Sequence, residues 1–175
     1  MSDCGLLLSV LEPAALKNTQ LQSTLLQNFQ PQEEVIELQL NEGEYHVECE
    51  YSISNGGGTG QEYPQNLLNP GEEPWNKWCA NPCPNSRSYV VVQFKNTIHF
   101  SQIGFKSAND EPSRDPTHVE IYVLTAGRVW SYVQTSELNF DSTIRHETIQ
   151  IKLDKLYKTT SLLCYFINLR DTDEI

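Results

Sequence analysis

Residues 104–130, GFKSANDEPSRDPTHVEIYVLTAGRVW, indicate the fold class of this chain. A polar loop, SANDEPSRDP, occupies positions 107–116, and its two prolines bias the residues before them away from helical conformations. A strand follows, in which Val119, Ile121 and Val123 alternate with more polar neighbours, as expected of a strand with one buried face. The segment therefore predicts an ordered loop between two strands.

Alternating apolar and polar positions continue through most of the chain. Residues 89–94 form a near-continuous apolar run, which is typical of a central strand. In residues 98–105 the alternation slips at Gln102, which predicts a β-bulge. Further strands are predicted at residues 128–134, 148–153 and 162–169, and a hairpin is predicted from residues 36–40 and 45–53. Short strands separated by turn residues predict an all-β sandwich.

Residues 13–29 depart from this pattern and predict a helix. Pro13 suits a first helical turn, and apolar residues at three- and four-residue spacings form one stripe. The stripe consists of Leu21, Leu25, Leu26 and Phe29. We expect the helix to cover an end or an edge of the domain, or alternatively to bind a partner. The predicted organisation is therefore an N-terminal helical extension at 1–32 and a β-sandwich domain at 33–175.

The charge of the chain is unevenly distributed. Its 175 residues suffice for a single domain with a sizeable core. The formal net charge is −11, and the imbalance lies in residues 1–76, which hold twelve acidic side chains and one basic side chain. No basic stripe is available to neutralise phosphates, which argues against nucleic-acid binding. A basic partner or a divalent cation remains open, beside the simpler interpretation that the acidic residues solvate one face.

The longest apolar cluster, residues 6–11, is too short to span a bilayer, and no basic residue precedes it as in a signal peptide. We therefore expect a cytoplasmic or nuclear protein without a membrane span. The five cysteines lack the spacing of a disulfide framework and are expected to be reduced thiols, with Cys49 and Cys164 in the core. The polar ending, DTDEI, predicts that the chain is part of a longer protein or complex.

Two segments resemble the discoidin-like (coagulation-factor C-type) domain family. The loop SANDEPSRDP contains the AND-x-P-x-R-D-P pattern of the family, and residues 65–68 and 77–78 resemble its NLL and TKW segments. The resemblance covers roughly residues 51–170 and implies the galactose-binding-like jelly-roll sandwich, with the leucines and the tryptophan in the core beneath the binding loops. The chain departs from the family at residues 124–127, where S-N-D-G is usual, and it lacks the usual final strand.

The resemblance also implies a structural Ca²⁺, because many domains of this fold hold the ion beside an N-L-L-D-G-D turn. Asn69 replaces the first aspartate here, and Asn69 and Glu72 offer oxygen ligands to a hard cation. A zinc site is the alternative. Four residues have the ligand types for it: His46, Cys49, Cys79 and Cys83. The first two lie three residues apart on a predicted strand and should point to opposite faces, which argues against zinc.

Discoidin-like domains bind through loops at one end of the sandwich, which implies a site formed by loops 54–63, 69–88 and 107–116. The candidate ligand-binding residues are Tyr63, Trp75, Asn109, Asp110 and Arg114. The aromatic side chains could stack on a sugar ring or a peptide side chain, and the polar ones could hydrogen-bond hydroxyls or a carboxylate. Alternatively, Arg114 pairs with Asp115 and pins its own loop. Trp78 and Trp130 are expected in the core.

No catalytic motif is recognisable, which favours a non-catalytic binding module. Two functions remain open. The domain binds a partner protein, as intracellular members of the family do, or it binds a glycan through the same loops, as carbohydrate-binding members do. The absence of secretion features favours an intracellular protein-interaction module as the main prediction, with carbohydrate binding as the alternative.

Overall fold

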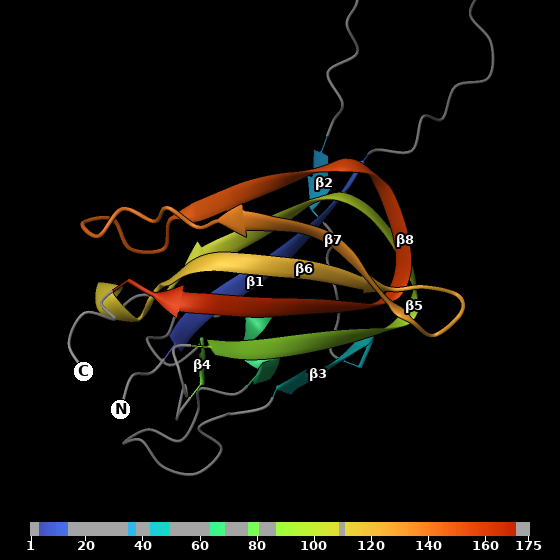
Figure 1. The fold of residues 1–175 in the computed structure, drawn as a ribbon, viewed down its shortest axis with the longest axis horizontal. Helices are drawn as coiled ribbons and strands as arrows, with labels where there is room; N and C mark the ends of the chain where they lie inside the picture. The colour runs from blue at the N-terminus through green and yellow to red at the C-terminus, as the bar shows by residue number, and fades with distance from the viewer. Residues whose placement is uncertain are drawn as a thin grey trace, which may run out of the picture.

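The computed structural model describes residues 4–13, 35–37, 43–49, 64–68, 77–80, 87–108 and 111–170. The strands are joined in one antiparallel sheet (Figure 1), which confirms the predicted all-β class. They are β1 (Cys4–Pro13), β2 (Val35–Glu37), β3 (Tyr45–Cys49), β4 (Trp78–Ala80), β5 (Arg87–Ser107), β6 (Pro116–Leu124), β7 (Trp130–Glu137) and β8 (Thr148–Leu169). The short 3-10 helices are η1 (Pro64–Leu67) and η3 (Pro112–Arg114). Among these described residues, no helix has the length and apolar character needed to cross a bilayer.

Two long strands, β5 and β8, fold the single sheet into a sandwich of two layers. The first half of β5 pairs with β3 and with the second half of β8, and β6 and β7 extend this front layer. The second half of β5 pairs with β1 and with the first half of β8, and β2 and β4 extend this back layer. β5 and β8 therefore each span two of the predicted strands. The register of β5 against β8 shifts between Gln93 and Ile98, where the layers meet, and again between Phe100 and Gln102, which confirms the predicted bulge.

The core lies between the two layers. Phe105 of the back layer meets Phe166 of the front layer edge to face, with ring centroids 6.0 Å apart. Trp78 of β4 packs on the same Phe166 at 5.9 Å and is fully buried, as predicted. In β6, Val119 and Ile121 are fully buried, whereas Glu120, which lies between them, is half-buried on the outer face. The period-two pattern of the strand after the polar loop thus determines which side chains enter the core.

The predicted hairpin of residues 36–40 and 45–53 is wrong for the residues that the structure describes. β2 pairs with β1 in the back layer, whereas β3 pairs with β5 in the front layer. Gly43, with a φ of +86°, leads the chain into β3. Alternation indicates which face of a strand is buried, but it does not select the neighbour with which the strand pairs.

β1 is a strand that the sequence pattern does not predict. Residues 6–11 of this strand pair with 102–107 of β5, although residues 1–32 are predicted to form a helical extension. An apolar run such as that of residues 6–11 cannot be assigned to strand or helix from periodicity alone. Pro13, the predicted start of the helix, is the last residue of β1, and residues 14–29 of that predicted helix lie outside the described residues.

Trp130 does not lie in the core, contrary to the prediction, because 38% of its surface is exposed. It is the first residue of β7, the last strand in the order of the front layer, and it occupies a position on the outer face opposite Leu124. Cys164 is fully buried, as predicted, and the half-buried Cys49 packs against the core. Both of these cysteines are free thiols, and burial raises the pKa of Cys164.

Candidate functional site

Two polar loops meet at the end of the sandwich where β6 begins and β8 ends, on the left in Figure 1. One loop connects β5 to β6 and contains η3, and the other, residues 138–147, connects β7 to β8. Pro116 at the start of β6 is paired with Leu169 at the end of β8, so that Arg170 projects from the same place. We call residues 107–108, 111–115, 138–147 and Arg170 the loop end.

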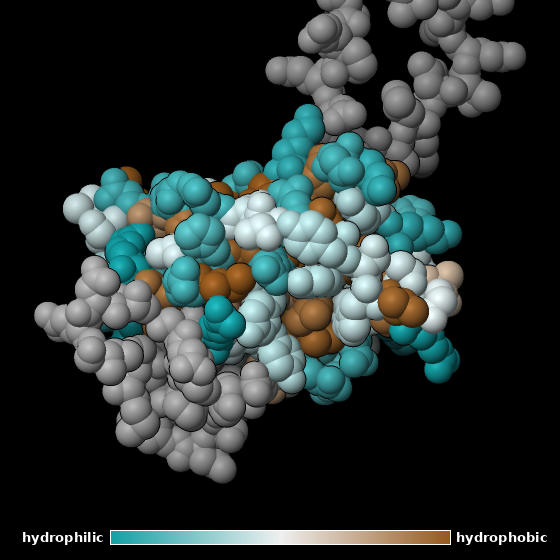
Figure 2. All heavy atoms as spheres, viewed as in Figure 1, coloured by the Kyte–Doolittle hydropathy of each residue, from teal (hydrophilic) through white to brown (hydrophobic). Residues whose placement is uncertain are grey.

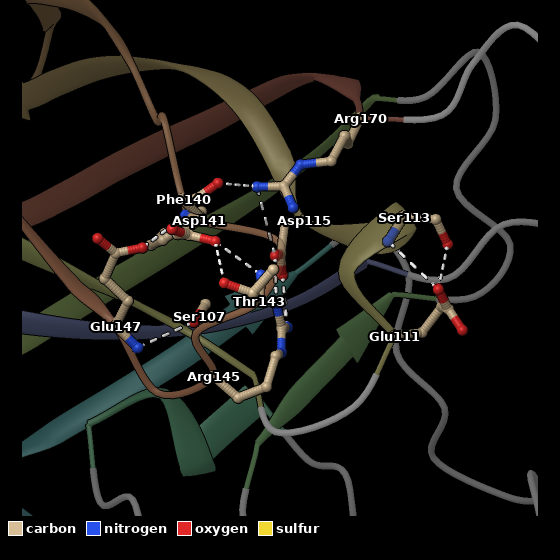
Figure 3. A network of polar contacts seen from close by, with 10 residues as sticks. All are labelled: Ser107, Glu111, Ser113, Asp115, Phe140, Asp141, Thr143, Arg145, Glu147 and Arg170. Carbon is tan, nitrogen blue, oxygen red and sulfur yellow. Dashed lines mark hydrogen bonds and ion pairs between the residues drawn. The ribbon is translucent and has the colours of Figure 1, made fainter.

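A buried ion pair joins the two loops. Asp115 is 1% exposed, and its two carboxylate oxygens accept hydrogen bonds from Arg145 Nη1 at 2.7 Å and Nη2 at 3.0 Å (Figure 3). Arg170 Nη2 lies 3.9 Å from Asp115 Oδ2 and also donates to the carbonyl oxygen of Phe140. Two-pronged guanidinium–carboxylate contacts of this kind are strong and geometrically specific. The pair therefore fixes the position of the 138–147 loop relative to η3.

The 138–147 loop is also ordered by its own polar contacts. Asp141 Oδ1 accepts hydrogen bonds from the backbone N–H and the hydroxyl of Thr143, both at 2.7 Å. These bonds, and the nearby charge of Arg170, lower the pKa of Asp141. Glu147 Oε2 accepts from the backbone N–H of Asp141, and the Glu147 backbone N–H donates to the hydroxyl of the buried Ser107 at 3.1 Å. The loop is thus tied at its base to the end of β5.

Across from it, η3 is capped by Glu111. The Glu111 carboxylate accepts from the hydroxyl of Ser113 at 3.0 Å and lies 3.4 Å from the Ser113 backbone nitrogen. Arg114, the last residue of η3, is half-buried, and its backbone N–H donates to the carbonyl oxygen of Glu111. The prediction pairs Asp115 with Arg114, whereas the two-pronged partner that the structure shows for Asp115 is Arg145. The sequence contains no local signal for this pair, because its members lie 30 positions apart.

The other predicted ligand-binding residues, Tyr63, Trp75, Asn109 and Asp110, lie outside the described residues. The same holds for the predicted calcium ligands, Asn69 and Glu72. Of the alternative zinc ligands, Cys83 lies outside the described residues and Cys79 lies in β4. His46 and Cys49 lie in β3, and His46 Nε2 is 3.4 Å from Glu48 Oε1 on the exposed face of this strand. In the part of the chain that the structure describes, no three His, Cys, Asp or Glu side chains cluster closely enough to hold a metal ion.

Comparison with known proteins identifies a related family. The model of the F5/8 type C domain family matches residues 50–163. None of the curated protein sequences compared matches the chain.

Several solved structures share the fold. A family 32 carbohydrate-binding module of NanJ from Clostridium perfringens, in complex with galactose, is 11% identical, with a TM-score of 0.58, over 73% of this chain and 85% of that one. A module from the same organism, in complex with GalNAc-β-1,3-galactose, is 12% identical, with a TM-score of 0.55, over 74% of this chain and 88% of that one. The family 32 module of EndoD from Streptococcus pneumoniae is 14% identical, with a TM-score of 0.50, over 71% of this chain and 84% of that one. The galactose-binding-like sandwich is thereby confirmed.

Proposed function

The chain belongs to the F5/8 type C domain family, and we propose that it is a non-catalytic module that binds carbohydrate at the loop end. The observation that carries this proposal is the Asp115–Arg145 pair, which holds two polar loops together in advance of binding. A site that is already ordered loses little conformational entropy when a ligand binds. The exposed hydroxyl and amide groups of the 138–147 loop, together with Arg114, suit the hydroxyl groups of a sugar.

Support also comes from the similar structures, because three of them are described as carbohydrate-binding modules and two of these contain galactose or a galactose disaccharide. These likenesses favour the carbohydrate-binding alternative over the main prediction of a protein-interaction module. Within the proposed site, Arg114 hydrogen-bonds the sugar, and Trp75 and Asn109 remain predicted contacts from the neighbouring loops. The structural Ca²⁺ at Asn69 and Glu72, and the intracellular location, also remain predictions.

The proposal is tested by a glycan array followed by calorimetric titration with galactose and with GalNAc-β-1,3-galactose. We expect Arg114→Ala to weaken binding at least about tenfold, since a few anchoring residues usually dominate a binding site. The matched control is Arg128→Ala, which removes the same side chain from the exposed turn at the opposite end of β6. Absence of binding to any glycan would contradict the proposal, and so would an equal loss in both variants.

A further inference from the structure

The outer face of the front layer carries a group of aromatic side chains far from the loop end. Figure 2, viewed onto this layer, shows hydrophobic residues in brown between paler and teal ones. In β6, Glu120 and Tyr122 face outward between the neighbouring strands. Glu120 is paired with Tyr165 of β8, and Tyr122 is paired with Tyr132 of β7. We call Glu120, Tyr122, Tyr132 and Tyr165 the tyrosine–glutamate cluster.

The cluster has a defined geometry. The Tyr122 hydroxyl donates a hydrogen bond of 2.7 Å to Glu120 Oε2. The rings of Tyr122 and Tyr132 lie 5.6 Å apart at 71°, so they form a corner and not a flat platform. Tyr132 is 54% exposed, and its hydroxyl lies 3.0 Å from that of Thr135, which is the β7 partner of Glu120. Tyr122 therefore contacts both the Glu120 carboxylate and the Tyr132 ring.

The electrostatic character of the cluster is negative. The hydrogen bond to Glu120, burial, and the charges of Glu120, Tyr132 and Tyr165 all raise the pKa of Tyr122, so its hydroxyl stays protonated. The faces of tyrosine rings add negative potential. This arrangement attracts a cation.

Glu120 is half-buried, and it has no ion-pair partner among the described residues. Its contact there is the hydrogen bond from Tyr122, which leaves Oε1 available. The outward positions of the described front-layer strands hold two further carboxylates, Glu48 and Glu137, and one lysine, Lys95, six positions along β5 from Tyr89, the residue that is paired with Tyr165. The arginine at an outward position of these strands, Arg87, lies at the start of β5. Among the described residues of this face, Glu120 therefore lacks a positive partner.

We propose that the tyrosine–glutamate cluster binds the guanidinium group of an arginine in a basic segment of a partner protein. A guanidinium group is planar, so it can stack on a tyrosine ring while it donates hydrogen bonds to a carboxylate, which a lysine ammonium group cannot do in the same way. The net charge of −11 favours approach of a basic segment. A sugar ring would instead need a flat aromatic face, which two rings at 71° do not offer. The surface is separate from the loop end, so either site can be present without the other.

The experiment titrates the full chain with the blocked peptide Ac-Gly-Arg-Gly-NH2 and follows the tyrosine ring signals by NMR. The control peptide contains citrulline, which has nearly the shape of arginine without its charge. We expect saturable shifts of the Tyr122, Tyr132 and Tyr165 rings with the arginine peptide, and binding at least about tenfold weaker with citrulline. Higher ionic strength should weaken the arginine binding, because an exposed ion pair is screened by salt.

Variants of the chain then locate the site. Glu120→Gln should weaken arginine binding about tenfold, whereas Glu137→Gln, which removes the same charge from an exposed position of β7, should change it less than about twofold. The proposal is overturned if the citrulline peptide binds equally well, if no ring signal saturates, or if Glu120→Gln retains full affinity. It is also overturned if galactose shifts these rings and the arginine peptide does not. None of these outcomes bears on galactose binding at the loop end, which the Arg114→Ala titration measures separately.

Discussion

Asp115 is the residue that connects the two loops of the proposed site. Its carboxylate is almost fully buried, and two arginines, Arg145 and Arg170, approach it from outside its own loop. A buried charge is tolerated when its partners are present, but it becomes costly when one of them is removed. The order of the loop end therefore depends on this one side chain more than on the exposed residues that would touch a ligand.

The substitution Asp115→Asn should lower the free energy of unfolding by about 3 kcal/mol, because it leaves the Arg145 and Arg170 guanidinium groups without their carboxylate. Urea unfolding measures the change. Asp141→Asn is the control, since Asp141 is an exposed carboxylate of the same loop end, and its effect should be much smaller. Equal effects of the two substitutions would mean that the buried pair does not hold the loops.

Trp78 stabilises the fold mainly through packing. Trp78→Ala should cost about 3–5 kcal/mol, the usual range for a large core aromatic, whereas Trp130→Ala should change stability by less than about 0.5 kcal/mol because Trp130 is partly exposed. The indole N–H of Trp78 is buried and has no hydrogen-bond partner among the residues that the structure describes. Trp78→Phe removes this donor and keeps most of the ring, so it should cost less than Trp78→Ala. Thermal melting of the three variants checks this order, and a Phe variant as unstable as the Ala variant would contradict it.

At the scale of elements, the bend of β8 sets the two-layer architecture. Thr159 is buried at this bend, and its hydroxyl lies 2.9 Å from the carbonyl oxygen of Leu124 and 2.8 Å from that of Ser161. The backbone N–H of Ser161 donates to the same hydroxyl at 3.0 Å. One side chain thus satisfies backbone groups where the strand passes between layers.

Tyr157 lies just before this bend, and its ring centroid is 6.2 Å from that of Phe100. Burial, together with the hydrogen bond to Asp154, raises the pKa of Tyr157 from 10.0 to about 12. Between pH 10.0 and about pH 12 the unfolded chain releases the tyrosine proton while the native chain keeps it, so the free energy of unfolding falls as pH rises. We expect the unfolding free energy to decline more steeply above pH 10 in the parent than in Tyr157→Phe. Parallel pH profiles of the two proteins would refute this.

Period-two alternation predicted the strands well where each had one buried face, as β6 does with Val119 and Ile121. It did not predict β1, whose sequence is apolar without alternation, nor the separation of β2 from β3. Pairing depends on contacts between distant segments, which no local pattern contains. The loop end shows the same limit: the polar loop before β6 was recognisable, but Arg145, its partner from the 138–147 loop, was not.

At the scale of the whole molecule, the sandwich presents two separate polar surfaces. The loop end lies where β6 begins, and the tyrosine–glutamate cluster lies further along the same strand on the outer face. The first is built from loops tied together by a buried ion pair, and the second is built from rigid strands. The two proposals assign a glycan to one surface and a basic protein segment to the other.

The most direct test of carbohydrate binding at the loop end is a titration of the isotope-labelled chain with galactose, followed through the backbone amide signals. Galactose binding at the loop end should give saturable shifts that concentrate in residues 107–116 and 138–147, with little change in the turn at 125–129 at the opposite end. Saturable shifts centred on the 125–129 turn would contradict it, and so would the absence of saturable shifts with galactose and with every glycan that the array identifies.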